Sequence, residues 1–193
     1  MKKIRLCLIL LITLSFASCA KEGFDLYSVK AVRKISASVD KDGVLLGIKE
    51  CVALNVRLSD DEIYTYRVSY PDLDLAYEGT IRNGEEAILE ITQGAHFASG
   101  EYKVVITNED GSDKDSSFAL LSYDLDNLPH YDSSGIYKGS ENVVIALENN
   151  DGIVSATPDD SIDLSAFSSA IFTYRDKYGN EITLKEELMS PSN

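Results

Sequence analysis

The sequence predicts an all-β fold in which antiparallel strands pack as a sandwich, and two kinds of observation lead to this prediction. A large apolar residue stands at every second position between Val52 and Leu58, and again between Tyr64 and Tyr70. This period of two is typical of strands with one buried face. Short turns that contain Asp-Gly or Asn-Gly separate such segments, as in a series of hairpins.

The expected strands follow one another at short intervals along the chain. They span, in order, 32–39, 51–58, 64–70, 76–81, 87–92, 102–107, 116–122, 142–148, 170–175 and 181–185. Turns at 40–43 (Asp-Lys-Asp-Gly) and 82–84 (Arg-Asn-Gly) join them, because these residues tolerate positive φ. One helical turn is expected at 163–168, capped by Asp160 or Ser161.

Composition divides the body of the chain into two β-rich parts. We expect a larger sandwich over 27–123, a polar linker over 124–135, and a smaller β-rich segment over 136–189. The second segment is too short for a robust core of its own, so it should pack on the first sandwich or complete a partial second one. The last residues, 190–193, are expected to fray.

The first 18 residues have the order of a secretory signal peptide: three cations, an apolar run over 6–16, and small residues before Cys19. Residues 16–19 (Phe-Ala-Ser-Cys) resemble the lipobox of bacterial lipoproteins, although Phe stands where Leu is common. The resemblance implies cleavage before Cys19, a diacylglyceryl group on its thiol, and a tether over 19–26. An ordinary secretory signal is the alternative.

The predicted membrane location and the net charge of the chain limit which kinds of partner are expected. The uncharged Ala20 predicts transfer to the outer rather than the inner membrane, because an Asp at that place resembles a retention signal. The chain has 18 Lys and Arg against 32 Asp and Glu, a net charge of −14. This excess argues against nucleic acid and against adhesion to anionic lipid. Membrane contact is therefore expected through the lipid on Cys19.

A local motif gives the sandwich a more specific identity. The spacing Leu89-x-Ile91, then Gly100-x-Tyr102-x-Val104, resembles the E to F corner of immunoglobulin-like domains. The resemblance covers about half of the chain and implies an immunoglobulin-like antiparallel sandwich of the bacterial Ig-like or fibronectin-like group. It makes Tyr102 the corner tyrosine, whose hydroxyl bonds back to the upstream backbone. Gly100 then admits the tight turn before the strand.

Cysteine and histidine usage predicts no catalytic, metal or cofactor site. With Cys7 in the signal peptide and Cys19 acylated, Cys51 cannot form an intrachain disulfide and is expected to be a small buried hydrophobe. His96 and His130 stand far apart, with no cysteine cluster at metal-ligand spacing. We therefore expect both to be ordinary loop or strand-end residues.

The carboxylates of acidic turns could bind calcium, but none of these turns has the residue spacing of a calcium-binding loop. The candidate ligands are Asp40, Asp42, Asp110, Asp113, Asp115, Asp124 and Asp126. Adjacent carboxylates are expected to be solvated, because neighbours on a strand point to opposite faces. These pairs are Glu85-Glu86, Asp159-Asp160 and Glu186-Glu187. Four tyrosines are expected in the core rather than on a sugar-stacking platform: Tyr64, Tyr66, Tyr70 and Tyr77.

Two classes of function remain. The first is a lipid-anchored, non-catalytic envelope or surface module that recognises or assembles with a protein partner through an edge strand or the sandwich loops. It rests on analogy of fold. The alternative is a glycan-directed lipoprotein enzyme or carbohydrate-binding accessory. A cleft between the two parts with two carboxylates in catalytic reach would favour the alternative, and a packed junction would favour the first.

Overall fold

The computed structural model of the chain describes residues 23–70, 76–91, 96–139, 141–158 and 162–188. Within them the protein is almost entirely β, as its sequence predicts. The strands are β1 (Leu26–Val39), β2 (Leu45–Leu58), β3 (Tyr64–Ser69), β4 (Ala76–Ile81), β5 (Glu86–Glu90), β6 (Gly100–Thr107), β7 (Asp113–Leu120), β8 (His130–Tyr131), β9 (Tyr137–Lys138), β10 (Val144–Asn149), β11 (Gly152–Ala156), β12 (Ser169–Arg175) and β13 (Glu181–Glu187). A short 3-10 helix, η1, spans Leu164–Ala166.

The strands form two large sheets and one small one. The larger sheet has seven strands in the order β11-β10-β12-β13-β1-β2-β5, and the second has four in the order β4-β3-β6-β7. The short strands β8 and β9 pair with each other. Neighbours are antiparallel throughout, except that β1 and β13 run parallel.

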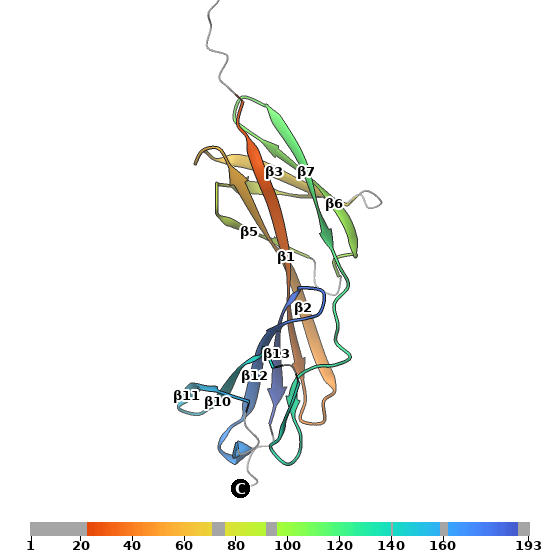
Figure 1. Cartoon of the computed structure of the whole chain (residues 1–193), viewed down its shortest axis with the longest axis vertical. Coiled ribbons are helices and arrows are strands. Elements are labelled where there is room, and N and C mark those ends of the chain that lie inside the picture. The colour runs from red at the N-terminus through yellow and green to blue at the C-terminus, as the bar shows by residue number, and fades with distance from the viewer. Residues whose placement is uncertain (1–22, 71–75, 92–95, 140, 159–161, 189–193) are drawn as a thin grey trace, which may run out of the picture.

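Strands β1 and β2 run through both halves of an elongated molecule (Figure 1). Each has 14 residues, and a strand of that length spans about 45 Å. In the upper part of Figure 1, β5 pairs with β2 and the four-stranded sheet packs across them. In the lower part, β13, β12, β10 and β11 extend the same sheet from the other side of β1.

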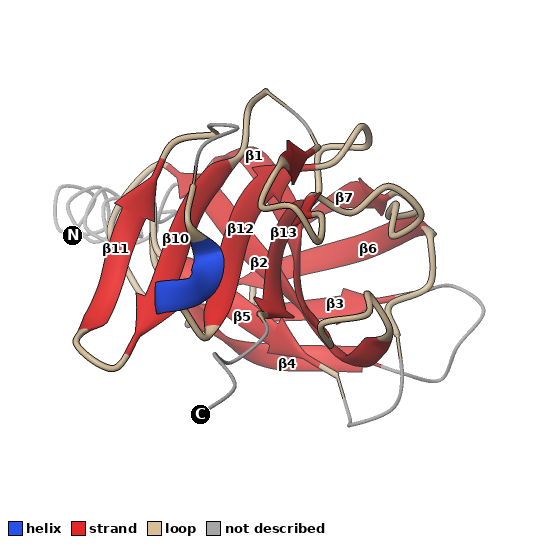
Figure 2. Cartoon of the chain, turned by 90° about the horizontal axis from the view of Figure 1, so that it is seen from below, coloured by secondary structure: helices blue, strands red, loops and turns tan. Residues whose placement is uncertain are grey.

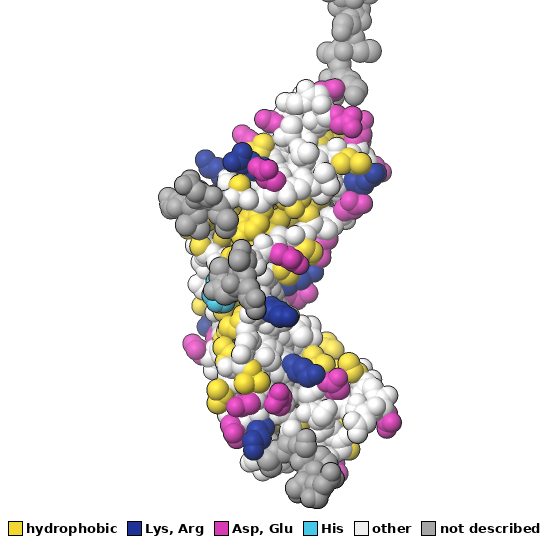
Figure 3. All heavy atoms as spheres, turned by 180° about the vertical axis from the view of Figure 1, so that it is seen from behind, with side chains coloured by type: hydrophobic (Ala, Val, Ile, Leu, Met, Phe, Trp, Pro, Cys, Tyr) yellow, Lys and Arg dark blue, Asp and Glu magenta, His cyan; other side chains and the backbone are white. Residues whose placement is uncertain are grey.

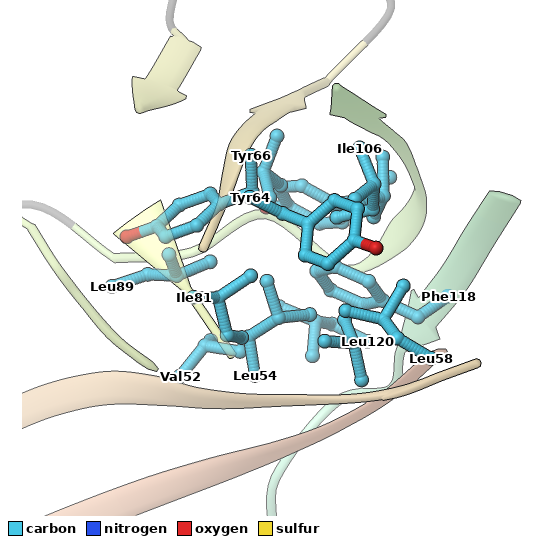
Figure 4. Close-up of a cluster of buried hydrophobic side chains, with 14 of the residues drawn as sticks. Val52, Leu54, Leu58, Tyr64, Tyr66, Ile81, Leu89, Ile106, Phe118 and Leu120 are labelled. Carbon is cyan, nitrogen blue, oxygen red and sulfur yellow. The ribbon is translucent and has the colours of Figure 1, made fainter. Parts of the chain in front are cut away.

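The first hydrophobic core lies in the upper part, between the two large sheets. Val52 and Leu54 of β2 meet Tyr64 and Tyr66 of β3, and Phe118 of β7 packs beside them (Figure 4). All five side chains are buried, as the period of two in the sequence predicts. Burying a large apolar side chain contributes about 1.5 to 3 kcal/mol, so this cluster is what holds the two sheets face to face.

The second core lies in the lower part, on the same face of β1 and β2. Ile35 of β1, Phe172 of β12 and Leu184 of β13 are buried there. The four-stranded sheet does not extend over this core in the described part of the chain. The segment 123–139 covers it instead, and the side chain of Tyr131 is buried against Phe172 with a ring-centroid distance of 5.8 Å.

The observed division of the chain differs from the predicted one. The prediction assigns β1 and β2 wholly to a unit over 27–123, whereas both strands supply residues to each core. Residues 124–135, which were predicted to form a linker, instead pack over the second core and include strand β8. The C-terminal segment over 136–189 gains its core by hydrogen-bonding to β1 through β13. The segment is too small to bury enough apolar surface alone, and this pairing with β1 provides the additional buried surface.

The predicted helical turn is present in shorter form as η1, but its cap differs. Asp163 caps it, because the Asp163 carboxylate accepts the N–H of Ser165 at 3.0 Å. Asp160 and Ser161, the predicted caps, lie outside the described residues. The cap therefore sits immediately before the first residue of the helix, in the usual position.

Candidate functional site

Cys19, the predicted lipidation site, lies outside the described residues. The first described strand, β1, begins at Leu26 at the upper end of the molecule (Figure 1). Any attachment through Cys19 therefore reaches the fold at the end that carries the first core. Among the described residues, no helix is long and apolar enough to cross a membrane.

Tyr102 lies on β6 in the position expected of a corner tyrosine. Its side chain is 3% exposed, and its hydroxyl donates to the carbonyl of Ala98 at 2.9 Å. The ring stacks on Phe118 at a centroid distance of 5.3 Å and contacts Tyr70 at 5.0 Å. Burial raises the pKa of Tyr102 to about 12. The hydroxyl therefore remains a neutral donor that fixes the chain entering β6.

Gly100 is required by close contact as well as by conformation. Its φ is 146°, and a Cβ placed on it would lie 2.7 Å from the hydroxyl oxygen of Tyr70. That hydroxyl donates to the carbonyl of Ser99 at 3.3 Å. A side chain at this position would require the Tyr70 ring to shift and would also be strained by the positive φ, which explains why glycine stands there.

A buried ion pair separates the two cores. Arg33 of β1 lies on the same face as Ala31 and Ile35, between the residues that enter the first core and those that enter the second. Arg33 Nε lies 3.1 Å from Glu50 Oε1, and both side chains are 1% exposed. This contact lacks hydrogen-bond alignment. The guanidinium instead donates through Nη2 to the carbonyl of Phe97 at 3.0 Å.

Two further side chains complete this group, which we call the junction cluster: Arg33, Glu50, His96 and Tyr123. His96 Nδ1 lies 3.0 Å from Glu50 Oε2, and its side chain is 50% exposed. The Tyr123 ring centroid lies 5.3 Å from Arg33 Cζ. Glu50 is the one carboxylate in the cluster, and two partners hold it. These contacts hold the described side chains of the junction together around Glu50.

His130 lies where an ordinary strand-end residue is expected, whereas Glu186 does not have its predicted setting. His130 is exposed on β8, where its Nδ1 lies 3.2 Å from the carbonyl of Leu128. Glu186 was expected to be solvated, and that expectation is wrong: its exposed fraction is 5%. The carboxylate faces inward from β13 and accepts the Tyr131 backbone N–H at 3.2 Å. A backbone donor supplied by a distant segment makes this burial possible.

The acidic turns use their carboxylates to stabilise the turns themselves. The Asp40 carboxylate accepts the N–H groups of Asp42 and Val44 at 2.9 and 2.8 Å. The same two bonds recur at Asp132 and Asp176. These bonds lower the pKa of Asp132. Within the described ranges, no three His, Cys, Asp or Glu residues are arranged to hold a metal ion.

The remaining candidates are structural. Cys51 is only half-buried, on the face of β2 opposite the cores, and burial raises its thiol pKa. This differs from the expected buried position and does not favour a thiolate. Tyr64 and Tyr66 are buried, and Tyr70 and Tyr77 pack against them as partly buried side chains. They form core rather than a sugar-stacking platform.

Strand β11 forms an open edge of the larger sheet that the sequence analysis did not identify. Among the described strands it pairs with β10 alone, and it lies at the border of the fold (Figure 2). Ile153 and Val154 are 60% and 47% exposed, and no residue of β11 is charged. Other open edges of the two large sheets do carry charges: Glu86 and Glu90 in β5, Glu78 in β4, Asp113, Lys114 and Asp115 in β7, and Lys49 in the lower part of β2.

The hairpin register shows which backbone groups of β11 face outward. Asn149 and Gly152 lie opposite each other across a two-residue turn. In such a hairpin the flanking pair is hydrogen-bonded, and every second pair repeats it. Gly152 and Val154 therefore direct their N–H and C=O groups toward β10. The corresponding groups of Ile153 and Ser155 point away from the sheet.

Surface charge is dispersed on the face seen in Figure 3. Asp and Glu side chains are scattered over both parts, with Lys and Arg between them rather than in one basic patch. Exposed ion pairs occur on the protein surface, such as Lys34 with Glu86 at 2.8 Å and Arg67 with Glu78 at 3.4 Å. The charged face thus has the character of a solvated surface.

No protein-family model matches this chain, and no curated protein matches it.

Proposed function

We propose that this protein is a lipid-anchored, non-catalytic binding or assembly module of the bacterial cell envelope, which recognises a protein partner through the edge strand β11. The observation that supports this proposal is that β11 is an open, uncharged edge of the larger sheet. Exposed Ile153 and Val154, an uncharged strand and outward-facing backbone groups occur together there. Proteins commonly protect open edges with charge, and β11 lacks that protection.

The partner should supply an extended, apolar strand. Val154 lies opposite the buried Leu147, so an added strand would continue the second core on that face. Ile153 lies opposite Glu148 on the other face. Main-chain hydrogen bonds would give affinity, and alternate side chains would give specificity. The net charge of −14 favours a segment flanked by basic residues.

The packed junction cluster supports a binding module over the glycan-directed enzyme. An enzyme of that class needs two carboxylates on either side of a bound sugar. At the junction, Glu50 is held between Arg33 and His96. Both contacts make Glu50 part of the link between the two cores.

We also propose that the upper part is an immunoglobulin-like sandwich and that Cys19 carries the lipid, with the outer membrane as its location. The bond from Tyr102 to Ala98 and the close contact at Gly100 support the first assignment. With the anchor near the start of β1, the edge strand β11 would lie at the far end of the molecule. This arrangement would present the edge away from the lipid surface.

Replacing Ser155 with proline should abolish partner binding, because it removes an outward-facing N–H while leaving the pairing with β10 intact. The measurement is photocrosslinking in the native cells from a benzoylphenylalanine placed at Val154. We expect one discrete adduct, lost in the Ser155→Pro protein and kept in Ser155→Ala. The matched control places the photoreactive residue at Ile88 of β5, which is 43% exposed. Equal adducts from both positions, or an adduct that survives Ser155→Pro, would contradict the proposal.

Replacing Cys19 with alanine should prevent lipidation, because the thiol is the only group at that position able to carry a diacylglyceryl chain. Cells grown with labelled palmitate should incorporate label into the parent protein and none into Cys19→Ala. The matched control is Cys51→Ala, which should remain labelled because Cys51 lies within β2. Equal labelling of the parent and Cys19→Ala proteins would rule out the anchor.

A further inference from the structure

A cavity of about 610 Å³ opens at the lower end of the molecule, beside the turn between β1 and β2. This volume falls within the range of about 300 to 1,000 Å³ that is typical of sites for small molecules. Its apolar lining includes Val39, Leu128 and Leu184, and Glu186 and His130 contribute polar groups. The cavity therefore offers an apolar surface beside many polar and charged groups.

Glu186 is the buried charged group of this cavity. Its exposed fraction is 5%, and within the described ranges its one hydrogen bond comes from the Tyr131 N–H at 3.2 Å. No described lysine or arginine forms an ion pair with it. Lys138, which also lines the cavity, lies 3.8 Å from Asp132 instead. Burial raises the pKa of Glu186, and the Tyr131 N–H and the neighbouring His130 oppose that rise only in part.

The charges around the cavity favour a positive ligand. Four carboxylates stand against two ammonium groups among the lining residues: Asp42, Asp126, Asp132 and Glu186 against Lys41 and Lys138. A cation that entered would meet this negative surface first and the buried carboxylate afterwards. A bare metal ion fits poorly, because the described residues contain no group of three metal-ligating side chains and much of the lining is apolar.

We infer that this cavity binds an organic cation, an ammonium or guanidinium group on an apolar chain, with Glu186 as its counter-ion. The positive group would complete the ion pair that Glu186 lacks, and Val39 and Leu184 would contact the chain. Charge-assisted hydrogen bonds between such groups are among the strong ones in proteins. The inference is independent of β11, which is separated from β13 by β10 and β12 in the sheet.

The test is calorimetric titration of the purified protein with hexylammonium, and with 1-hexanol as the neutral molecule of similar shape. Hexylammonium should bind in preference to 1-hexanol. Glu186→Gln should raise the Kd for hexylammonium by roughly 10- to 100-fold, because it removes one charge-assisted contact. The Kd for 1-hexanol should not change.

Asp42→Asn is the matched control, because it removes the same unit of charge from an exposed residue of the rim. It should change the Kd by less than about twofold, since exposed charges are screened. Hexylammonium should also raise the melting temperature of the parent protein, a measurement that needs no variant. Absence of binding, equal binding of 1-hexanol, or equal losses in Asp42→Asn and Glu186→Gln would each overturn the inference.

Discussion

Replacing Arg33 with alanine should lower the free energy of unfolding by about 3 to 5 kcal/mol, the usual cost of leaving one member of a buried ion pair without its partner. The Glu50 side chain is 1% exposed and would remain buried without the guanidinium. The carbonyl of Phe97 would also lose its donor. Urea unfolding of the protein expressed without residues 1–19 measures the change.

Two further variants separate the charge effect from the loss of a side chain. Lys34→Ala removes the neighbouring cation on β1, whose pair with Glu86 is exposed by 34% and 49%. It should cost no more than about 1 kcal/mol. The double variant Arg33→Met with Glu50→Leu should regain most of the stability lost in Arg33→Ala, because no charge is left buried. If Arg33→Ala were as stable as Lys34→Ala, the pair would have no role in joining the cores.

Replacing Tyr102 with alanine should cost on the order of 3 to 5 kcal/mol, because it removes a buried ring and leaves a cavity. Phe118 and Tyr70 would both lose their contacts with that ring. Tyr102→Phe should cost about 1 to 3 kcal/mol, because the carbonyl of Ala98 would lose its donor. The same urea experiment measures both variants.

An exposed tyrosine on β1 gives the control for Tyr102. Tyr27 is 68% exposed, and Tyr27→Ala should change the stability by no more than about 0.5 kcal/mol. A Tyr102→Ala protein as stable as its parent would disprove the corner assignment. It would also remove the main support for an immunoglobulin-like sandwich in the upper part.

The first core could be predicted from the sequence because its strands alternate in the simplest way. Val52, Leu54 and Tyr64 each stand at a position that the period of two places inward, and all are buried. Turn residues such as the Asp40 carboxylate act locally, through bonds to N–H groups two and four residues later. Local interactions of this kind are visible in a sequence because both partners are close along the chain.

The full length of β1 and β2 could not be predicted for the opposite reason. Arg33 and Glu50 occupy inward positions, so a charged residue interrupts the apolar period of two at each of them. What keeps the strands continuous is the pairing of these two charges across the sheet and the carbonyl of Phe97. A charge can be buried where its partner is positioned by another strand, and a single segment does not show that partner.

The same reasoning applies to the two candidate sites. Glu186 stands beside Glu187, and only the distant Tyr131 N–H makes its burial possible. The existence of strand β11 could be predicted locally, because the turn Asn149 to Gly152 is followed by the β-branched residues Ile153 and Val154. Its open edge is a property of the whole sheet, which depends on which strands pair. No window of the sequence contains that information.

The continuity of β1 also determines how the molecule would carry mechanical load. A pull between the start of β1 and a partner held at β11 would act largely along the strand direction. The load would cross the ladder between β1 and β13, whose six register pairs run from Lys34–Glu181 to Val39–Glu186. Force along strands loads the hydrogen bonds of a ladder together in shear rather than one after another. A tethered envelope protein of this design would extend little before its partner detaches.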